Sequence, residues 1–67
     1  MDLITLGQKI RSAREIAALS QRDLADRIGL DQSAVSRLER GQQELRVSDL
    51  YAWAEACETT VKTILEA

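Results

Sequence analysis

The side chains best suited to chemistry in this sequence gather on one expected helix, over residues 32–40. An amide, two hydroxyls and a guanidinium recur there at a spacing that places them on one face: Gln32, Ser33, Ser36 and Arg37. Val35 and Leu38 take the opposite face and are expected to be buried. Glutamine bonds adenine at two points, and arginine bonds guanine likewise. These groups suit hydrogen bonding to base edges, and on spacing alone an ordinary solvated helix surface is the commoner explanation for such a face.

The composition gives little support to covalent or metal chemistry. The 67 residues contain no His and a single Cys, Cys57, so neither an internal disulfide nor a four-ligand zinc site can form. No nucleophile–base pair is evident, and no cofactor is expected. We therefore expect a binding protein and not an enzyme.

The net charge of −2 at first argues against a polyanion as partner, but the charges are unevenly distributed. Residues 1–46 hold eight Lys or Arg against seven Asp or Glu, whereas residues 47–67 hold one against four. Seven arginines lie between Arg11 and Arg46. A basic surface is compatible with this composition if those arginines share a face, which composition leaves undecided.

The polar face over residues 32–40 must be positioned by neighbouring elements, and the apolar spacing predicts several short helices. The first is expected from about Asp2 to Ala18. Ser20, followed three residues later by Asp23, is an approximate capping box that opens a second helix over residues 21–28. A turn of three residues follows, in which a glycine ends one helix and an aspartate caps the next: Gly29, Leu30 and Asp31. So short a turn makes the two helices cross steeply and leaves the second one projecting.

Two further helices are expected after Gly41. Ser48 is predicted to cap the fourth helix, and Thr59 or Thr60 to start the fifth. Their apolar faces comprise Leu50, Ala54 and Cys57 in the fourth, and Val61, Ile64 and Leu65 in the fifth. The prediction is an all-α fold with residues 1–67 as a single domain. No apolar run approaches the ~20 residues of a membrane span, so we expect a soluble, cytoplasmic protein without a membrane partner.

The segment from Ser20 to Gly41 resembles the helix-turn-helix of the lambda-repressor-like, or Xre, family of Cro and phage-repressor proteins. Its pattern is Ser-Gln, then Leu-Ala, Gly and a helix that ends in Val-Ser-x-Leu-Glu-x-Gly. Ten positions fit at fixed spacing: Ser20, Gln21, Leu24, Ala25, Gly29, Val35, Ser36, Leu38, Glu39 and Gly41. The resemblance implies a compact five-helix DNA-binding domain with the motif at helices two and three. It also implies a sequence-specific transcriptional regulator, of repressor or controller type, that reads the major groove.

The family's residue roles carry over by position. The recognition helix would touch base edges through Gln32, Ser33, Ser36 and Arg37. Phosphates would be contacted from the start of the second helix and from the loop after the third, by Gln21, Gln42, Gln43 and Arg46. An exposed connector is an equally weighted interpretation of that loop. The sequence also departs from the family there, since the family's Asn-Pro is replaced by Glu44-Leu45-Arg46-Val47. Arg14 and Glu39 stand where the family has a structural ion pair.

The C-terminal third of the chain is expected to pair with a second copy. Trp53 is offset from the Leu50 stripe and should be partly exposed, forming a dimer interface with Val61, Ile64 and Leu65. A homodimer would read a palindromic double-stranded operator with half-sites about one helical turn, ~34 Å, apart. The alternative on the same fold is a protein-interaction module, either an antitoxin or a coactivator-like adaptor, with a protein partner.

Overall fold

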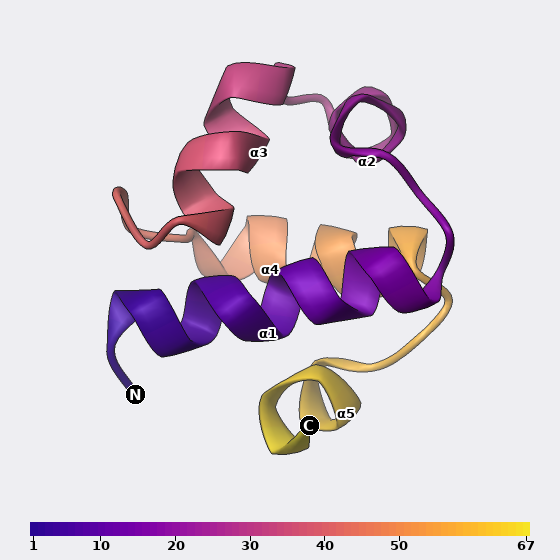
Figure 1. Cartoon of the computed structure of the whole chain (residues 1–67). Helices are drawn as coiled ribbons and strands as arrows, with labels where there is room; N and C mark the ends of the chain where they lie inside the picture. The colour runs from indigo at the N-terminus through magenta and orange to yellow at the C-terminus, as the bar shows by residue number, and fades with distance from the viewer.

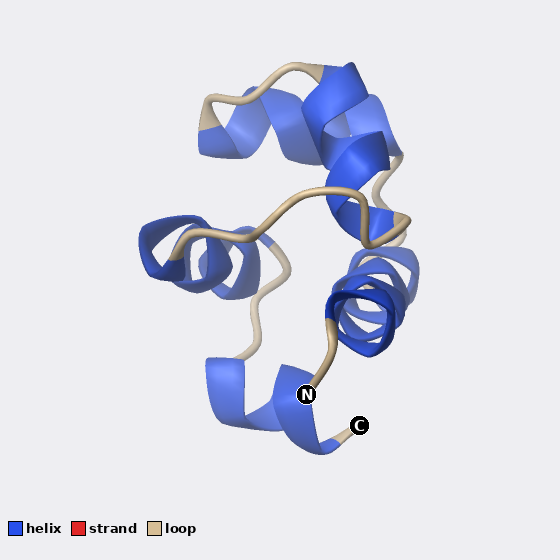
Figure 2. Ribbon diagram, turned by 90° about the vertical axis from the view of Figure 1, so that its left-hand side faces the viewer, coloured by secondary structure: helices blue, strands red, loops and turns tan.

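The computed structural model describes all 67 residues. It contains five helices joined by turns and loops, and no strands. The helices are α1 (Leu3–Ile16), α2 (Gln21–Ile28), α3 (Gln32–Glu39), α4 (Val47–Ala56) and α5 (Val61–Glu66). α1 and α4 lie side by side in the middle, α2 and α3 cover them on one side, and α5 closes the other side (Figures 1 and 2). This confirms the all-α prediction and the order of its helices. None of the helices is long and apolar enough to cross a membrane.

Four of the five helices begin at a side-chain cap. Asp2, Ser20, Asp31 and Thr60 each accept a hydrogen bond from the backbone N–H three residues further on, at 2.7 to 3.1 Å. Such a bond satisfies one of the N–H groups that the first turn of a helix leaves without a partner. The predicted caps of α1, α2 and α3 are confirmed, and Thr60 is the cap of α5.

The predicted cap of α4 is wrong. α4 begins at Val47, so Ser48 already lies in its first turn, and Arg46 occupies the capping position without a side-chain hydrogen bond. Leu45 is partly buried against the core just before this point. α4 therefore begins without a side-chain cap, directly after a residue that is packed on the core.

Four helices end at a residue in the left-handed backbone region. Gly29 and Gly41 have φ of 76° and 70°, and the non-glycine residues Ala18 and Glu58 have φ of 59° and 55°. At Gly41 there is a second constraint, because a Cβ atom there would lie 2.7 Å from Cα of Ile4. Glycine is thus required at position 41 both by conformation and by close approach.

One core joins all five helices. Its buried apolar residues are Ile10, Leu24, Ala25, Val35, Leu38, Trp53, Ala54, Cys57 and Ile64. α2 and α3 bury their predicted residues in it, so the inward orientation of Val35 and Leu38 is confirmed at 0% and 3% exposure. The core therefore fixes which side of α3 faces outward.

The expected partial exposure of Trp53 is wrong. Its side chain is fully buried, and its Nε1–H donates to the backbone carbonyl of Ile10 at 2.9 Å. Ile64 is also in the core, at 2% exposure. α4 contacts α2 and α5, and Trp53 also reaches α1. More of the surface of α4 is therefore buried than the single apolar stripe that its spacing predicts. Trp53 and Ile64 are therefore inaccessible to a partner, whereas Val61 and Leu65 remain partly exposed.

Candidate nucleic-acid interface

A polar hollow lies between the start of α2, the outer face of α3 and the loop that follows α3. It is open, has a volume of about 450 Å³, and no hydrophobic residue lines it. Its lining residues are Gln21, Gln32, Ser33, Ser36, Arg37, Arg40 and Gln42. All four residues predicted to contact bases and two of the four predicted to contact phosphate are therefore brought together. Gln43 and Arg46 lie outside the lining.

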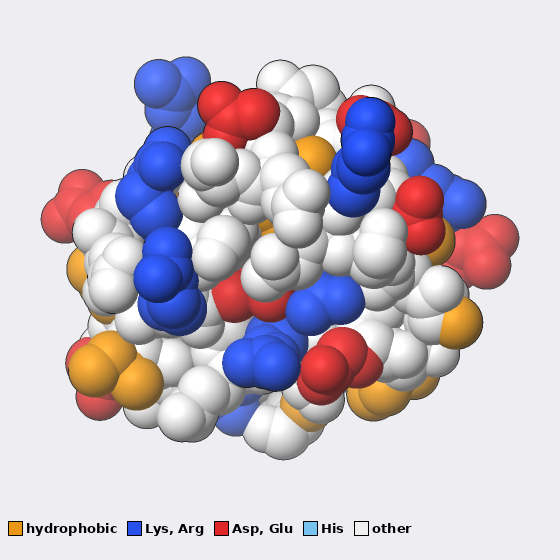
Figure 3. All heavy atoms as spheres, turned by 45° about the horizontal axis from the view of Figure 1, so that its top comes forward, with side chains coloured by type: hydrophobic (Ala, Val, Ile, Leu, Met, Phe, Trp, Pro, Cys, Tyr) orange, Lys and Arg blue, Asp and Glu red, His pale blue; other side chains and the backbone are white.

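Figure 3 shows the molecule from the side of α2 and α3. Much of this face is uncharged, and Lys and Arg side chains lie both at its edges and near the lower centre of the view, with acidic groups among them. On α3 itself, Gln32, Ser33 and Arg37 are exposed and Ser36 is half-buried. The side of α3 that faces outward is thus rich in hydrogen-bonding groups and free of apolar ones.

The turn between α2 and α3 makes this face project. The N–H of Leu30 donates to the carbonyl of Ala25 at 3.0 Å, around Gly29 in its left-handed conformation. Asp31 then caps α3 by accepting from the N–H of Ala34 at 2.7 Å. Local hydrogen bonds therefore set the orientation of α3 relative to α2, and the polar face of α3 makes no contribution to it.

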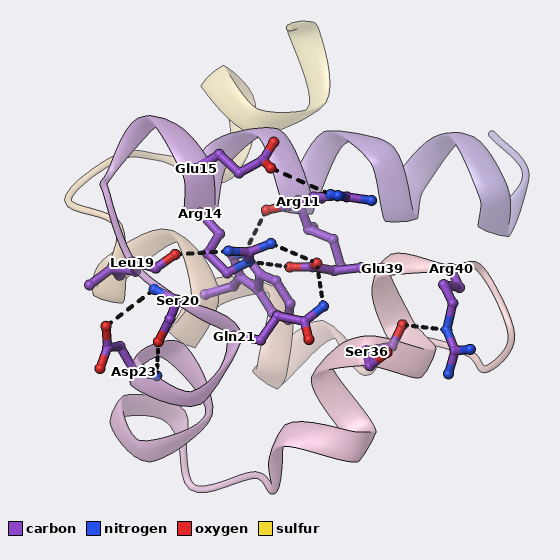
Figure 4. A network of polar contacts seen from close by, with 12 residues as sticks. Arg11, Arg14, Glu15, Leu19, Ser20, Gln21, Asp23, Ser36, Glu39 and Arg40 are labelled. Atoms are coloured by element: carbon purple, nitrogen blue, oxygen red, sulfur yellow. Dashed lines mark hydrogen bonds and ion pairs between the residues drawn. The ribbon is translucent and has the colours of Figure 1, made fainter.

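A buried ion pair lies beneath the hollow, and it is the predicted pair of Arg14 and Glu39 (Figure 4). Nε of Arg14 is 2.6 Å from Oε2 of Glu39, and Nη2 is 3.0 Å from Oε1. Nη1 of Arg14 donates to the carbonyl of Leu19 at 2.8 Å. The bonds to Glu39 raise the pKa of Arg14, so its charge is retained on burial. The pair ties the end of α1 to the end of α3.

Gln21 is held by the same pair. Its Nε2 donates to Oε1 of Glu39 at 3.0 Å, and its side chain is half-buried at the floor of the hollow (Figure 4). An amide nitrogen has two hydrogens, so one N–H of Gln21 remains available to a ligand. Glu39 thus positions a residue of the hollow although its own carboxylate is buried.

The N-terminus of α2 presents free backbone donors beside Gln21. The hydroxyl of Ser20 accepts from the N–H of Asp23 at 3.0 Å, and the carboxylate of Asp23 accepts from the N–H of Ser20 at 3.2 Å. Hydrogen bonding by Ser20, chiefly from its backbone N–H, lowers the pKa of the Asp23 carboxyl group. The N–H groups of Gln21 and Arg22 have no acceptor within the protein. Free N–H groups and the positive end of a helix dipole together suit an anion such as phosphate.

The arginines do not share one face. Arg37 and Arg40 line the hollow, and Arg40 was not among the residues predicted to contact DNA. Its place three residues after Arg37 is the signal that could have assigned it, since that spacing keeps it on the same side of α3. Arg14 is buried, Arg11 pairs with Glu15 on α1 at 3.5 Å, and Arg27 donates to a backbone carbonyl of α4. Only part of the positive charge therefore faces the hollow.

The structure contains no metal-binding cluster, and its one cysteine is buried. No group of three His, Cys, Asp or Glu side chains lies close enough to hold a metal ion. Cys57 is a buried free thiol whose pKa is raised by loss of solvent. The hollow on α2 and α3 is the candidate site.

Comparisons with known sequences are consistent with this geometry. A family model described as helix-turn-helix matches residues 10–64. The uncharacterized HTH-type transcriptional regulator y4dL of Sinorhizobium fredii is 41% identical over 54 residues, which are 81% of this chain and 28% of that protein. The chain thus spans less than a third of the length of this relative.

Solved structures share the whole arrangement. The restriction-modification controller C.AhdI of Aeromonas hydrophila has a TM-score of 0.86 at 34% identity, covering 92% of this chain and 94% of that one. The clp gene regulator ClgR of Corynebacterium glutamicum has a TM-score of 0.90 at 28% identity, covering 94% and 67%. The DNA-binding domain of the P22 C2 repressor has a TM-score of 0.85 at 25% identity, covering 100% and 88%. The expected five-helix repressor-like fold is confirmed.

Proposed function

The chain belongs to the helix-turn-helix family of DNA-binding transcriptional regulators, and from this premise we propose that it reads a double-stranded operator through the polar face of α3. The observation that carries the proposal is the hollow, in which side chains from α2, α3 and the following loop converge without one apolar residue. An α-helix fits the major groove of B-DNA, and polar side chains read the base edges there. This is a family of regulators and not of enzymes.

Base contacts come from the four outward residues of α3. Gln32 and Arg37 supply planar groups that form two hydrogen bonds to one base, adenine for glutamine and guanine for arginine. Ser33 and Ser36 both donate and accept, so they tolerate more than one base. Gln32 and Ser33 lie at the N-terminal end of α3, the end that contacts base edges in helix-turn-helix proteins.

Phosphate contacts flank this helix on both sides. On one side are the remaining N–H of the Gln21 amide and the free backbone N–H groups at the start of α2. On the other side are Arg40, Gln42 and Arg46, which are exposed at the end of α3 and in the loop. Two sets of donors separated by α3 match the two phosphate backbones that border a groove.

The protein acts as a homodimer in this proposal, with the pairing surface on α4 and α5. Val47 and Tyr51 are 70% and 63% exposed on one side of α4, and Tyr51 shares a hollow with Val61 of α5. Leu65 is partly exposed one turn after Val61. α5 lies on the opposite side of the molecule from α2 and α3, so pairing there leaves the polar face free (Figure 1). Domains 26 Å in their longest dimension can place two α3 helices ~34 Å apart, one turn of DNA.

Selection of bound sequences from a random pool of duplexes tests this proposal, followed by affinity measurements across salt. We expect a palindromic site whose affinity falls by roughly 10³–10⁵ between 50 and 200 mM salt, for a dimer that neutralises ~6–10 phosphates. Arg37→Ala should lose preference at one base pair of the selected site. Arg11→Ala is its matched control, because Arg11 is exposed on α1 and pairs only with Glu15. No enriched sequence and a flat salt response would instead favour the adaptor on the same fold. We also propose a cytoplasmic location for the protein, together with its operator.

A further inference from the structure

The loop after α3 turns back along the helix that it has just left. The N–H of Gly41 donates to the carbonyl of Leu38 at 3.1 Å, and the N–H of Gln42 donates to the carbonyl of Arg37 at 2.9 Å. Two such bonds around a left-handed glycine form a Schellman helix end. Backbone bonds therefore fix the path of the chain up to Gln43, whose side chain is half-buried beside the last turn of α3.

Gln43 reaches Arg37 from this position. Nε of Arg37 donates to Oε1 of Gln43 at 2.9 Å. The other arginine of the hollow, Arg40, bonds instead to the backbone carbonyl of Ser36 at 3.3 Å. A guanidinium has five N–H donors in one plane, so the bond to Gln43 occupies the inner one and leaves the four at the outer end free.

Resting on the proposed function, we propose that Gln43 is a positioning residue that selects how Arg37 reads guanine. With Nε–H engaged by Gln43, Arg37 meets O6 and N7 of guanine through its two terminal nitrogens. The bond also reduces the rotamer freedom that an exposed arginine would otherwise lose on binding. Gln43 was expected to contact phosphate. In this proposal its main effect is on base preference, although it touches no base.

Three substitutions in the whole chain separate the two roles, with Kd measured on the selected site and on its variants at the base pair read by Arg37. Gln43→Lys and Gln43→Met both remove the acceptor, the first with added positive charge and the second without charge. Both should reduce the preference for guanine roughly fivefold, as expected for one hydrogen bond. Gln43→Lys should nevertheless strengthen binding to all sequences. Gln43→Glu keeps an acceptor, so the preference should stay within about twofold while overall affinity falls through repulsion by phosphate.

If Gln43 only contacts phosphate, the variants should behave differently. Gln43→Lys would then bind more tightly with its guanine preference unchanged, and that result would overturn the positioning role. In an Arg37→Ala background, Gln43→Lys should leave base preference unaltered, and a change there would also contradict the proposal. A wild-type chain without any sequence preference would overturn the proposed function itself, and this inference with it. Equal thermal unfolding midpoints for the three variants should confirm that the fold is not involved.

Discussion

Removing the negative charge of Glu39 should destabilise this domain far more than an ordinary surface substitution. The Glu39 side chain is 2% exposed and that of Arg14 is 10% exposed, so Glu39→Gln leaves a buried cation without its counter-ion. Breaking one partner of a buried pair costs about 3–5 kcal/mol. A chain of 67 residues has a free energy of unfolding of roughly 3–10 kcal/mol. The substitution should therefore remove at least about a third of the stability.

Urea unfolding followed by Trp53 fluorescence measures this loss. Trp53 is the only tryptophan, is fully buried, and donates a hydrogen bond within the core, so its emission reports the global transition. The matched control is the double variant Arg14→Met with Glu39→Leu, which replaces the pair by apolar groups of similar size. It should recover most of the stability, because no buried charge is left unpaired. A loss below about 1 kcal/mol for Glu39→Gln, as for an exposed pair, would refute the reasoning.

The same double variant links the ion pair to the site. With Glu39 gone, Gln21 loses the acceptor that holds its amide at the floor of the hollow. We expect a folded protein whose affinity falls to a similar extent for all DNA sequences, because a phosphate contact is weakened and no base contact is lost. A selective loss at one base pair would contradict this assignment of Gln21.

Three further predictions concern single positions. Ala18→Gly should raise the free energy of unfolding by roughly 0.5–1 kcal/mol, since Ala18 has φ of 59°, whereas Ala17→Gly at a right-handed position should lower it; urea midpoints compare them. Arg46→Asp should supply the missing cap of α4 and add about 1 kcal/mol to stability in the same assay, while weakening DNA binding through the lost positive charge. Cys57 should resist alkylation until the protein unfolds. Burial raises the pKa of its thiol above the ordinary 9.0, so the free energy of unfolding should fall as pH rises from 9.0 through the pKa of the folded state. Cys57→Ala should remove that fall.

The features that sequence reasoning predicted correctly depend on short-range bonds. Ser20 with Asp23 and Asp31 with Ala34 are pairs three residues apart, so their chemistry is visible in the order of residues. The orientation of α3 follows equally from the spacing of its apolar residues. Resemblance supplied the Arg14–Glu39 pair, which joins positions 25 residues apart that no local rule connects.

The features that sequence reasoning missed depend on where distant elements lie. The burial of Trp53 requires that α1 reach α4, because Ile10 provides the acceptor for its indole N–H. The bond between Gln43 and Arg37 requires the exact return of the loop, which depends on Gly41 and its close contact with Ile4. Neither arrangement follows from periodicity, since periodicity describes one helix at a time.

The central claim is that the outward side chains of α3 read bases, and base-resolved affinity for Arg37→Ala tests it most directly. Kd is measured for the wild type and the variant on the selected site and on each of its single-base substitutions. We predict that the variant loses about 1–3 kcal/mol of affinity and loses preference at one base pair in each half-site, with the other preferences kept. An even loss at every base pair, or an unchanged profile, would show that Arg37 does not read a base.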